Sequence, residues 1–362
     1  MVKDWYSILR DLNIYIKNGG GKKSSFRLSF GSRQRSAACR TVSPPPAPPP
    51  ARTGREVAMA AAAFARGTGL CTAQLPRPLL RTQRIFASGG GAPGRRQHCQ
   101  QVPAEPRLTR TWQQDGIRNI VLNNPLKRNA LSLSMISSLR EDILHDIEST
   151  DLRVIIISGE GPIFSSGHDL KELAFEKGEK HHREVFETCS EVMTLLPKLP
   201  VPVIAKVNGL ATAAGCQLVA SCDVAVASEK SRFATPGVNV GLFCSTPGVA
   251  VGRSLPRKVA MEMLLTGEPM TAQEALLHGL ISRVVPEDKL EDETLRIARR
   301  ICESSRPVVA LGKATFYKQM EQDVGTAYRT ASRVMVENLA LQDGQEGIKA
   351  FVSKRKPAWS HS

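Results

Sequence analysis

The chain has 362 residues and a net charge of +15 at pH 7. Residues 1–110 contain 19 of its 49 basic and four of its 34 acidic residues, so residues 111–362 contain 30 of each sign and are neutral. The basic charge therefore gives no support to nucleic-acid binding by the folded part. No run of 18 apolar residues occurs, so the sequence predicts no membrane-spanning helix.

The N-terminal part divides into two segments of biased composition. Residues 1–58 include the run SPPPAPPPAR and are predicted to be a disordered upstream extension. Residues 59–110 begin at a second methionine and contain six arginines before their first acidic residue, Glu105. This composition predicts a mitochondrial transit peptide followed by a linker, and hence a protein of the mitochondrial matrix; a solvated, disordered arm is the alternative.

Residues 111–255 alternate strand-like and helical patterns. The β-rich run IRNIVLN (117–123) ends in the turn NPLKRN, and Ser132 can cap a helix that follows. That helix has an apolar stripe of Leu133, Ile136, Leu139, Ile143 and Ile147. Further apolar strands are expected at 153–159, 201–209 and 224–228. The alternation predicts an α/β core of ββα or βαβ units.

Residues 256–362 contain no further strand-like run and are predicted to be a helical region for oligomerisation, with a lid as the alternative. Thr271 and Glu274 have the spacing of a capping box, and Gly279 is expected to end that helix. Three more helices are expected near 287–304, 308–320 and 326–341.

The eight cysteines stand at positions 39, 71, 99, 189, 216, 222, 244 and 302 and form no CxxC pair. No histidine cluster has the spacing of a zinc site either. We therefore expect no metal site and no disulfide framework, and a reducing compartment suits such a chain.

Two loops of small residues are candidates for binding a ligand through the backbone. FSSGHDLKEL (164–173) follows one strand, and NGLATAAGCQL (208–218) leads from another strand into a helix near Ala213–Gly215. Free N–H groups at a helix start favour negative charge, so the two loops together predict an oxyanion hole. Tight packing of small residues is the alternative that their spacing leaves open.

Five ordered motifs resemble the enoyl-CoA hydratase/isomerase, or crotonase, family. They are NPxxRNALS, FSSGHDLKEL, NGxAxAAGCQL, CDVAVASEKSRFATP and TGEPMTAQEALLHGLISRVV, and the likeness covers about residues 114–357. The resemblance implies a ClpP/crotonase-like spiral of ββα units with a C-terminal helical trimerisation region. It also implies binding of acyl-CoA thioesters and assembly into trimers or hexamers, with no further cofactor.

The resemblance also implies roles for individual residues. The thioester oxygen would be held by the backbone N–H groups of His168 and Ala214. The edge of the coenzyme A site would be formed by Asp169, Leu170 and Lys171, and the nucleotide phosphates would be approached by Lys127 and Arg128. Other residues expected near the thioester are Gln217, Asn239 and Cys244.

The sequence departs from the family at both catalytic glutamates. Gln217 and Gly237 stand at these positions. An amide is no carboxylate base near neutral pH, and glycine has no side chain, so we expect hydration to be severely impaired.

Three functions remain open from the sequence. The first is a mitochondrial protein of fatty-acid metabolism that binds acyl-CoA without turnover. The second is an enzyme, such as a decarboxylase of malonyl-type CoA esters, in which the oxyanion hole stabilises an enolate and the His168 imidazole takes part. RNA binding, known in one branch of the family, ranks last because the first core helix has a single basic residue, Arg140.

Overall fold

The computed structural model describes residues 107–361. The predicted upstream extension (residues 1–58) lies outside this range. So do residues 59–106 of the predicted transit peptide and linker (59–110). The first strand, β1 (Thr109–Gln114), starts two residues before the predicted beginning of the core at residue 111.

A six-stranded sheet forms the centre of the core, in the order β1-β2-β3-β5-β7-β10. β1 pairs antiparallel with β2, and the other neighbours are parallel. The predicted strands are confirmed as β2 (Ile117–Leu122), β3 (Val154–Gly159), β5 (Val203–Val207) and β7 (Val224–Ser228).

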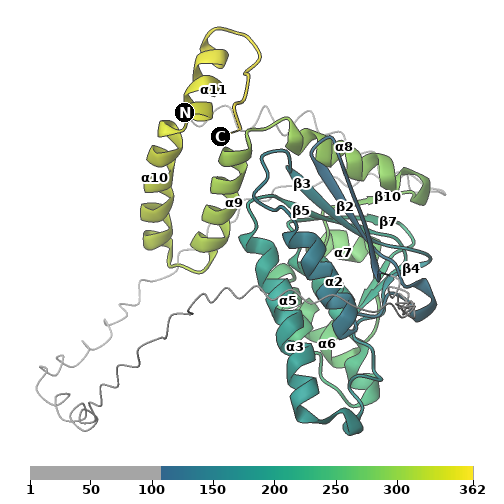
Figure 1. Ribbon diagram of the computed structural model, residues 1–362. Helices are drawn as coiled ribbons and strands as arrows, with labels where there is room; N and C mark the ends of the chain where they lie inside the picture. The colour runs from purple at the N-terminus through teal and green to yellow at the C-terminus, as the bar shows by residue number, and fades with distance from the viewer. Residues whose placement is uncertain (1–106, 362) are drawn as a thin grey trace, which may run out of the picture. The chain divides into compact units, whose positions relative to one another are not determined.

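Alternate residues of these strands enter two different apolar cores. On β3, Ile155 and Ile157 face a large core with helices α2 (Leu133–Leu144), α3 (Gly178–Leu195) and α4 (Ala214–Ser221). Val154 and Ile156 face a smaller core closed by α8 (Leu290–Cys302). Figure 1 shows α8 on one side of the sheet and α2 and α3 on the other. Coverage of both faces explains why these strands are continuously apolar.

The predicted start of α2 is confirmed, because the Ser132 hydroxyl accepts the Met135 N–H. The helix ends at Leu144, so Ile147 lies beyond it, although this side chain still packs against the large core.

A second, four-stranded sheet has the order β4-β6-β8-β9. Its strands are β4 (Ile163–Ser165), β6 (Leu210–Thr212), β8 (Arg232–Ala234) and β9 (Met270–Thr271). The prediction that strands stop before residue 256 is wrong, because β9 and also β10 (Arg283–Val285) follow it. Both are too short to produce an alternating pattern, and they extend sheets that are formed earlier in the chain.

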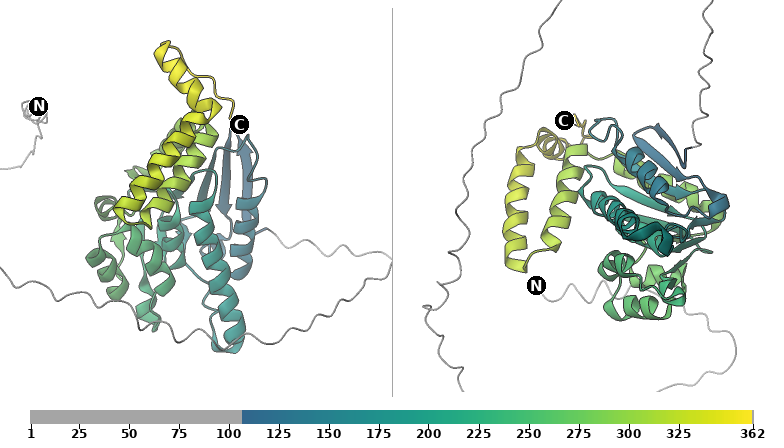
Figure 2. Two further views of the ribbon diagram at one scale, coloured as in Figure 1. Left: turned by 90° about the vertical axis from the view of Figure 1, so that its left-hand side faces the viewer. Right: turned by 60° about the horizontal axis from the view of Figure 1, so that its bottom comes forward.

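The remaining helices are α5 (Ser245–Ser254), α6 (Arg257–Thr266), α7 (Ala272–His278), α9 (Arg306–Met320), α10 (Val324–Ala340) and α11 (Gln342–Val352). α7 has the predicted capping box and ends at Gly279, whose φ is +87°. α9 and α10 form an antiparallel pair beside the core, seen in both views of Figure 2, and α11 was not predicted. Within residues 107–361, no helix is long and apolar enough to cross a membrane.

Candidate functional site

The two predicted backbone loops are in direct contact. A Cβ placed on Gly167 would lie 2.8 Å from the Ala213 Cβ and 3.2 Å from the Ala214 nitrogen. A Cβ on Gly215 would lie 2.7 Å from the Ser165 carbonyl oxygen. Both positions therefore require glycine, and the resulting closeness brings the backbone of His168 next to the start of α4.

The turn at residues 124–131 holds the first of these loops in place. The buried Asn129 side chain donates to the Glu160 and Ile163 carbonyls at 2.9 and 2.8 Å. The Ser165 hydroxyl donates to the Asn129 carbonyl and accepts the Gly167 N–H. The Ser166 N–H donates to the Arg128 carbonyl, so the exposed Lys127 and Arg128 lie beside this loop.

Two backbone donors remain at the point where the loops meet. Ala214 is the first residue of α4, so its N–H has no partner within the helix. Within the described part of the chain, neither this N–H nor that of His168 donates a hydrogen bond to another residue. Ala213 precedes α4 with φ 49° and ψ −118°, a conformation that costs energy for a residue with a Cβ. Free backbone donors held at a fixed turn are the arrangement that an oxyanion hole requires.

The His168 imidazole is oriented by the protein and is neutral. Its Nδ1 lies 3.2 Å from the Leu131 carbonyl oxygen, which can only accept, so Nδ1 bears the proton. The ring packs edge-on against Phe186, with 5.1 Å between centroids. Burial lowers the pKa of His168, against the hydrogen bond to Leu131, which raises it. Nε2 is therefore a buried lone pair, and it has no hydrogen-bond partner among the described residues.

Gln217 lies on α4 one turn beyond Ala214 and is only 4% exposed. Residues three apart share a helix face, so its side chain starts on the same face as Ala214. Its Oε1 is buried and has no partner within residues 107–361. The amide thus stands where a catalytic glutamate is expected in the family, and it presents an unused acceptor.

The second glutamate position has no room for any side chain. A Cβ on Gly237 would press against the Leu242 carbonyl oxygen and would lie 2.8 Å from the Cys244 Sγ. Burial raises the pKa of the Cys244 thiol, and that of the neighbouring Cys216 to about 12, so both are protonated. The Cys244 thiol and the Leu242 carbonyl therefore occupy the space that a side chain at position 237 would need.

Of the other predicted residues, Asp169, Leu170 and Lys171 belong to the first loop, whereas Asn239 lies elsewhere. Asp169 Oδ1 accepts the Lys171 N–H, while Leu170 and Lys171 are exposed. Asn239 is exposed in a 3₁₀ helix (Pro236–Val240) and lies beside Gly267 at the end of α6. Its environment does not join it to the two loops.

Several residues that order the site were not singled out from the sequence. Phe186 is separated from His168 by 18 positions, so no local pattern connects them. Glu172, whose carboxylate accepts the Leu133 N–H at 2.8 Å, fastens the loop to α2. Asn129 could have been suspected, since asparagine tolerates positive φ, and its φ is 50°.

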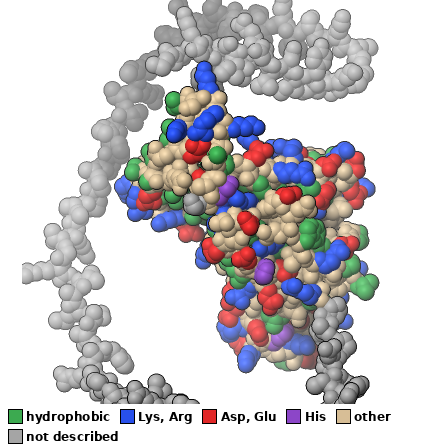
Figure 3. Space-filling model, turned by 45° about the horizontal axis from the view of Figure 1, so that its top comes forward, with side chains coloured by type: hydrophobic (Ala, Val, Ile, Leu, Met, Phe, Trp, Pro, Cys, Tyr) green, Lys and Arg blue, Asp and Glu red, His purple; other side chains and the backbone are tan. Residues whose placement is uncertain are grey.

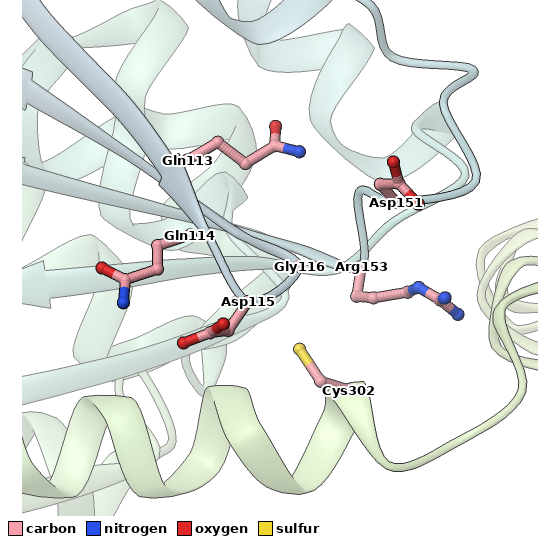
Figure 4. A pocket seen from close by; sticks show the side chains of 7 residues that line it. All are labelled: Gln113, Gln114, Asp115, Gly116, Asp151, Arg153 and Cys302. Atoms are coloured by element: carbon pink, nitrogen blue, oxygen red, sulfur yellow. The ribbon is translucent and has the colours of Figure 1, made fainter.

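A separate surface hollow of about 430 Å³ shares no residue with these loops. Figure 4 shows that it lies between the β1–β2 turn, Asp151, Arg153 and the Cys302 end of α8. Among residues 107–361, no group of three His, Cys, Asp or Glu side chains could hold a metal ion, and Cys189, Cys216, Cys222, Cys244 and Cys302 are free thiols.

Comparisons with known proteins agree with this geometry. The model of the enoyl-CoA hydratase/isomerase family matches residues 112–362. The chain is 73% identical over 258 residues to a Mus musculus protein named enoyl-CoA hydratase domain-containing protein 3, mitochondrial, covering 71% of this chain and 86% of that protein. The Homo sapiens protein of that name is 65% identical over 307 residues, covering 84% of this chain and 99% of that protein.

Solved structures confirm the predicted crotonase fold. The crystal structure of the human enoyl coenzyme A hydratase domain-containing protein 3 has a TM-score of 0.69 and 72% identity, covering 70% of this chain and all of that one. An enoyl-CoA hydratase from Mycobacterium smegmatis has a TM-score of 0.68 and 44% identity, covering 70% and 99% of the two chains. The chain therefore belongs to the enoyl-CoA hydratase/isomerase family.

Proposed function

We propose that this protein binds acyl-CoA thioesters through the paired N–H groups of His168 and Ala214 and does not hydrate enoyl-CoA. The observation that supports binding is the contact of the two loops, which leaves both donors free beside each other. Preorganised donors of this kind stabilise a polarised carbonyl oxygen.

The proposed lack of hydration rests on two departures from the family's catalytic residues. Gln217 replaces an acid with an amide that takes up no proton near neutral pH. Gly237 has no space even for a methyl group, because the Leu242 carbonyl and the Cys244 thiol fill it. A water molecule would therefore find neither a base to activate it nor an acid to complete the addition.

The decarboxylase alternative is less well supported. A malonyl-type substrate brings its own carboxylate, whose binding would need a nearby proton donor or cation. The His168 ring offers only the Nε2 lone pair, since its proton is directed to Leu131. RNA binding is also disfavoured, because on the face in Figure 3 basic and acidic side chains are interspersed over the core.

The names of the mouse and human relatives include the word mitochondrial, which supports a mitochondrial location, and we place the protein in the matrix with a role in fatty-acid metabolism. We also propose a homotrimer or hexamer. This assembly would cover the apolar side chains exposed on the C-terminal helices, among them Phe316, Met320, Tyr328 and Met335.

The test is to incubate the full chain separately with crotonyl-CoA, a 3-enoyl-CoA and methylmalonyl-CoA. Binding is followed by thermal shift against coenzyme A alone, and products by mass spectrometry. We expect stabilisation by a thioester and no product. Rapid hydration of crotonyl-CoA would contradict the proposal, and product from methylmalonyl-CoA that vanishes in His168→Ala would establish the decarboxylase instead.

A further inference from the structure

The last described residues of the chain connect helix α11 with the core. The Trp359 indole N–H donates to the Glu303 carbonyl, which follows α8, at 2.8 Å. The ring of Trp359 also lies against α11, because a Cβ on Gly347 would be 3.2 Å from it. Figure 1 shows the C-terminal end of the chain beside the connection between α8 and α9. Residues 358–361 therefore bridge α11 and the core, and we call them the C-terminal clasp.

Asp343 is the anchor of the clasp on α11. This residue is 1% exposed, and its carboxylate accepts the Ser360 N–H at 2.7 Å, the Ser360 hydroxyl at 2.8 Å and the His361 N–H at 3.1 Å. Burial raises the pKa of Asp343, but the hydrogen bonds that the carboxylate accepts lower it to about 2. The anchor is therefore ionised from neutral pH down to well below pH 5.

The His361 imidazole is the contact of the clasp with the core. Its Nδ1 receives two donors, the Arg153 guanidinium and the backbone N–H of Arg306 at 3.3 Å. Both groups can only donate, so Nδ1 is an unprotonated acceptor. A proton on Nδ1 would make it a third donor facing the other two, and it would place a positive ring beside the guanidinium. This contact is therefore incompatible with a protonated imidazole.

The charged residues that act on the ring come from three parts of the fold. Arg153 precedes β3, Arg306 begins α9, and Asp343 lies on α11. Burial lowers the pKa of His361 and Arg153 lowers it further, whereas Asp343 raises it. The lowering effects are the larger ones, so the ring takes up a proton only below about pH 6.5, the ordinary value for histidine.

We propose that the C-terminal clasp is a pH-sensitive switch, which holds α11 against the core at neutral pH and releases it when His361 is protonated. Because Asp343 is ionised in both states, the imidazole is the group that titrates. The core keeps α9 after release, since Lys313 on α9 binds Asp223 independently of the clasp. This inference does not depend on the proposed binding of acyl-CoA.

The fluorescence of Trp359 reports whether the clasp is closed. The other tryptophans of the chain are replaced by Trp5→Phe and Trp112→Phe, and emission and far-UV circular dichroism are recorded between pH 7.5 and 5. We expect the emission to move to longer wavelength with a midpoint below about pH 6.5, while most of the helical signal remains. An emission maximum that does not move would overturn the inference, as would a shift that accompanies unfolding of the whole chain.

Two histidine variants of this chain identify the group that titrates. His361→Gln keeps an acceptor for the two donors but takes up no proton, so its emission should stay constant over the same pH range. His145→Gln makes the same change at an exposed position after α2 and should keep the shift. A full shift in His361→Gln, or its loss in His145→Gln, would assign the titration to another group and overturn the inference.

Hydrogen exchange of the native chain decides the question if His361→Gln fails to fold. At pH 5.5 the amides of α11 should lose protection relative to pH 7.5, after correction for the intrinsic exchange rate, while those of α10 keep it. Equal protection of α11 at the two pH values would show that the clasp stays closed when histidine is protonated, and the switch would not exist.

Discussion

At the scale of single residues, Gly237 is a position of the candidate site that has no room for a side chain. Gly237→Ala would press a methyl group against the Leu242 carbonyl and the Cys244 thiol. We expect a loss of about 1–3 kcal/mol in the free energy of unfolding, the usual cost of overpacking. Chemical denaturation measures it, and Gly252→Ala is the matched control, since a Cβ there meets nothing within 4 Å inside α5.

The same crowding predicts that the family's acids cannot simply be restored. The double variant Gln217→Glu/Gly237→Glu should remain without hydratase activity toward crotonyl-CoA and should unfold more easily than the native chain. Gln217→Glu alone should fold but lack the second acid. Measurable hydration in the double variant would show that the 237–244 segment adapts to a side chain.

The buried His168 ring predicts how stability depends on pH. Its pKa is lowered in the folded state, so the unfolded chain binds the proton more readily. The free energy of unfolding should therefore be greatest above about pH 6.5, the ordinary value for histidine, and should fall as the pH drops through the folded-state pKa. His361 acts in the same direction, because burial and Arg153 lower its pKa too.

The measurement is urea denaturation between pH 5 and 7.5. His168→Asn should reduce the slope of unfolding free energy against pH without abolishing it, since His361 is still present. An identical slope in the variant would mean that His168 binds protons equally in the folded and unfolded states, and that the fold does not lower its pKa.

At the scale of elements, the sequence correctly predicted those features that depend only on neighbouring residues in the chain. Ser132, Thr271 and Gly279 marked helix ends because capping depends on one or two neighbouring residues. The three-residue strands β4, β6 and β8 escaped prediction because their pairing partners lie far away in the chain. The crowding of Gly237 by Cys244, seven positions later, was not predicted either, because the motif gives the residue type but not its surroundings.

Helix α9 is held to the core in part by a cluster of polar contacts around Lys313. The Lys313 Nζ donates to the carbonyls of Leu196 and Val201 and lies 2.7 Å from Asp223 Oδ2. The two side chains are 7% and 15% exposed, and the Tyr317 hydroxyl donates to the other Asp223 oxygen. Lys313→Met would leave a buried carboxylate without its cation.

We expect this variant to lose about 3–5 kcal/mol of stability, as is typical when one partner of a buried pair is removed. Lys318→Met lies at an exposed position of the same helix and should change little. Equal effects of the two substitutions, measured by chemical denaturation, would show that apolar packing alone holds α9 in place.

At the scale of the whole molecule, the neutral charge of residues 111–362 and the apolar surface of the C-terminal helices point to association between copies rather than to binding of a polyanion. On α10, Val324, Tyr328, Met335 and Leu339 fall at helical spacing and are all exposed. An apolar stripe of four turns has no reason to face water unless another surface covers it.

Met335→Asp would place a charge in the middle of this stripe, and an uncompensated charge in an apolar interface is strongly unfavourable. We expect sedimentation analysis to show a trimer or hexamer for the native chain and mainly monomer for the variant, with thermal stability that depends on protein concentration only in the native chain. Met335→Leu keeps the stripe apolar and should keep the native mass. A native chain that sediments as a monomer at all concentrations would leave the stripe free for a different partner and would contradict the proposed assembly.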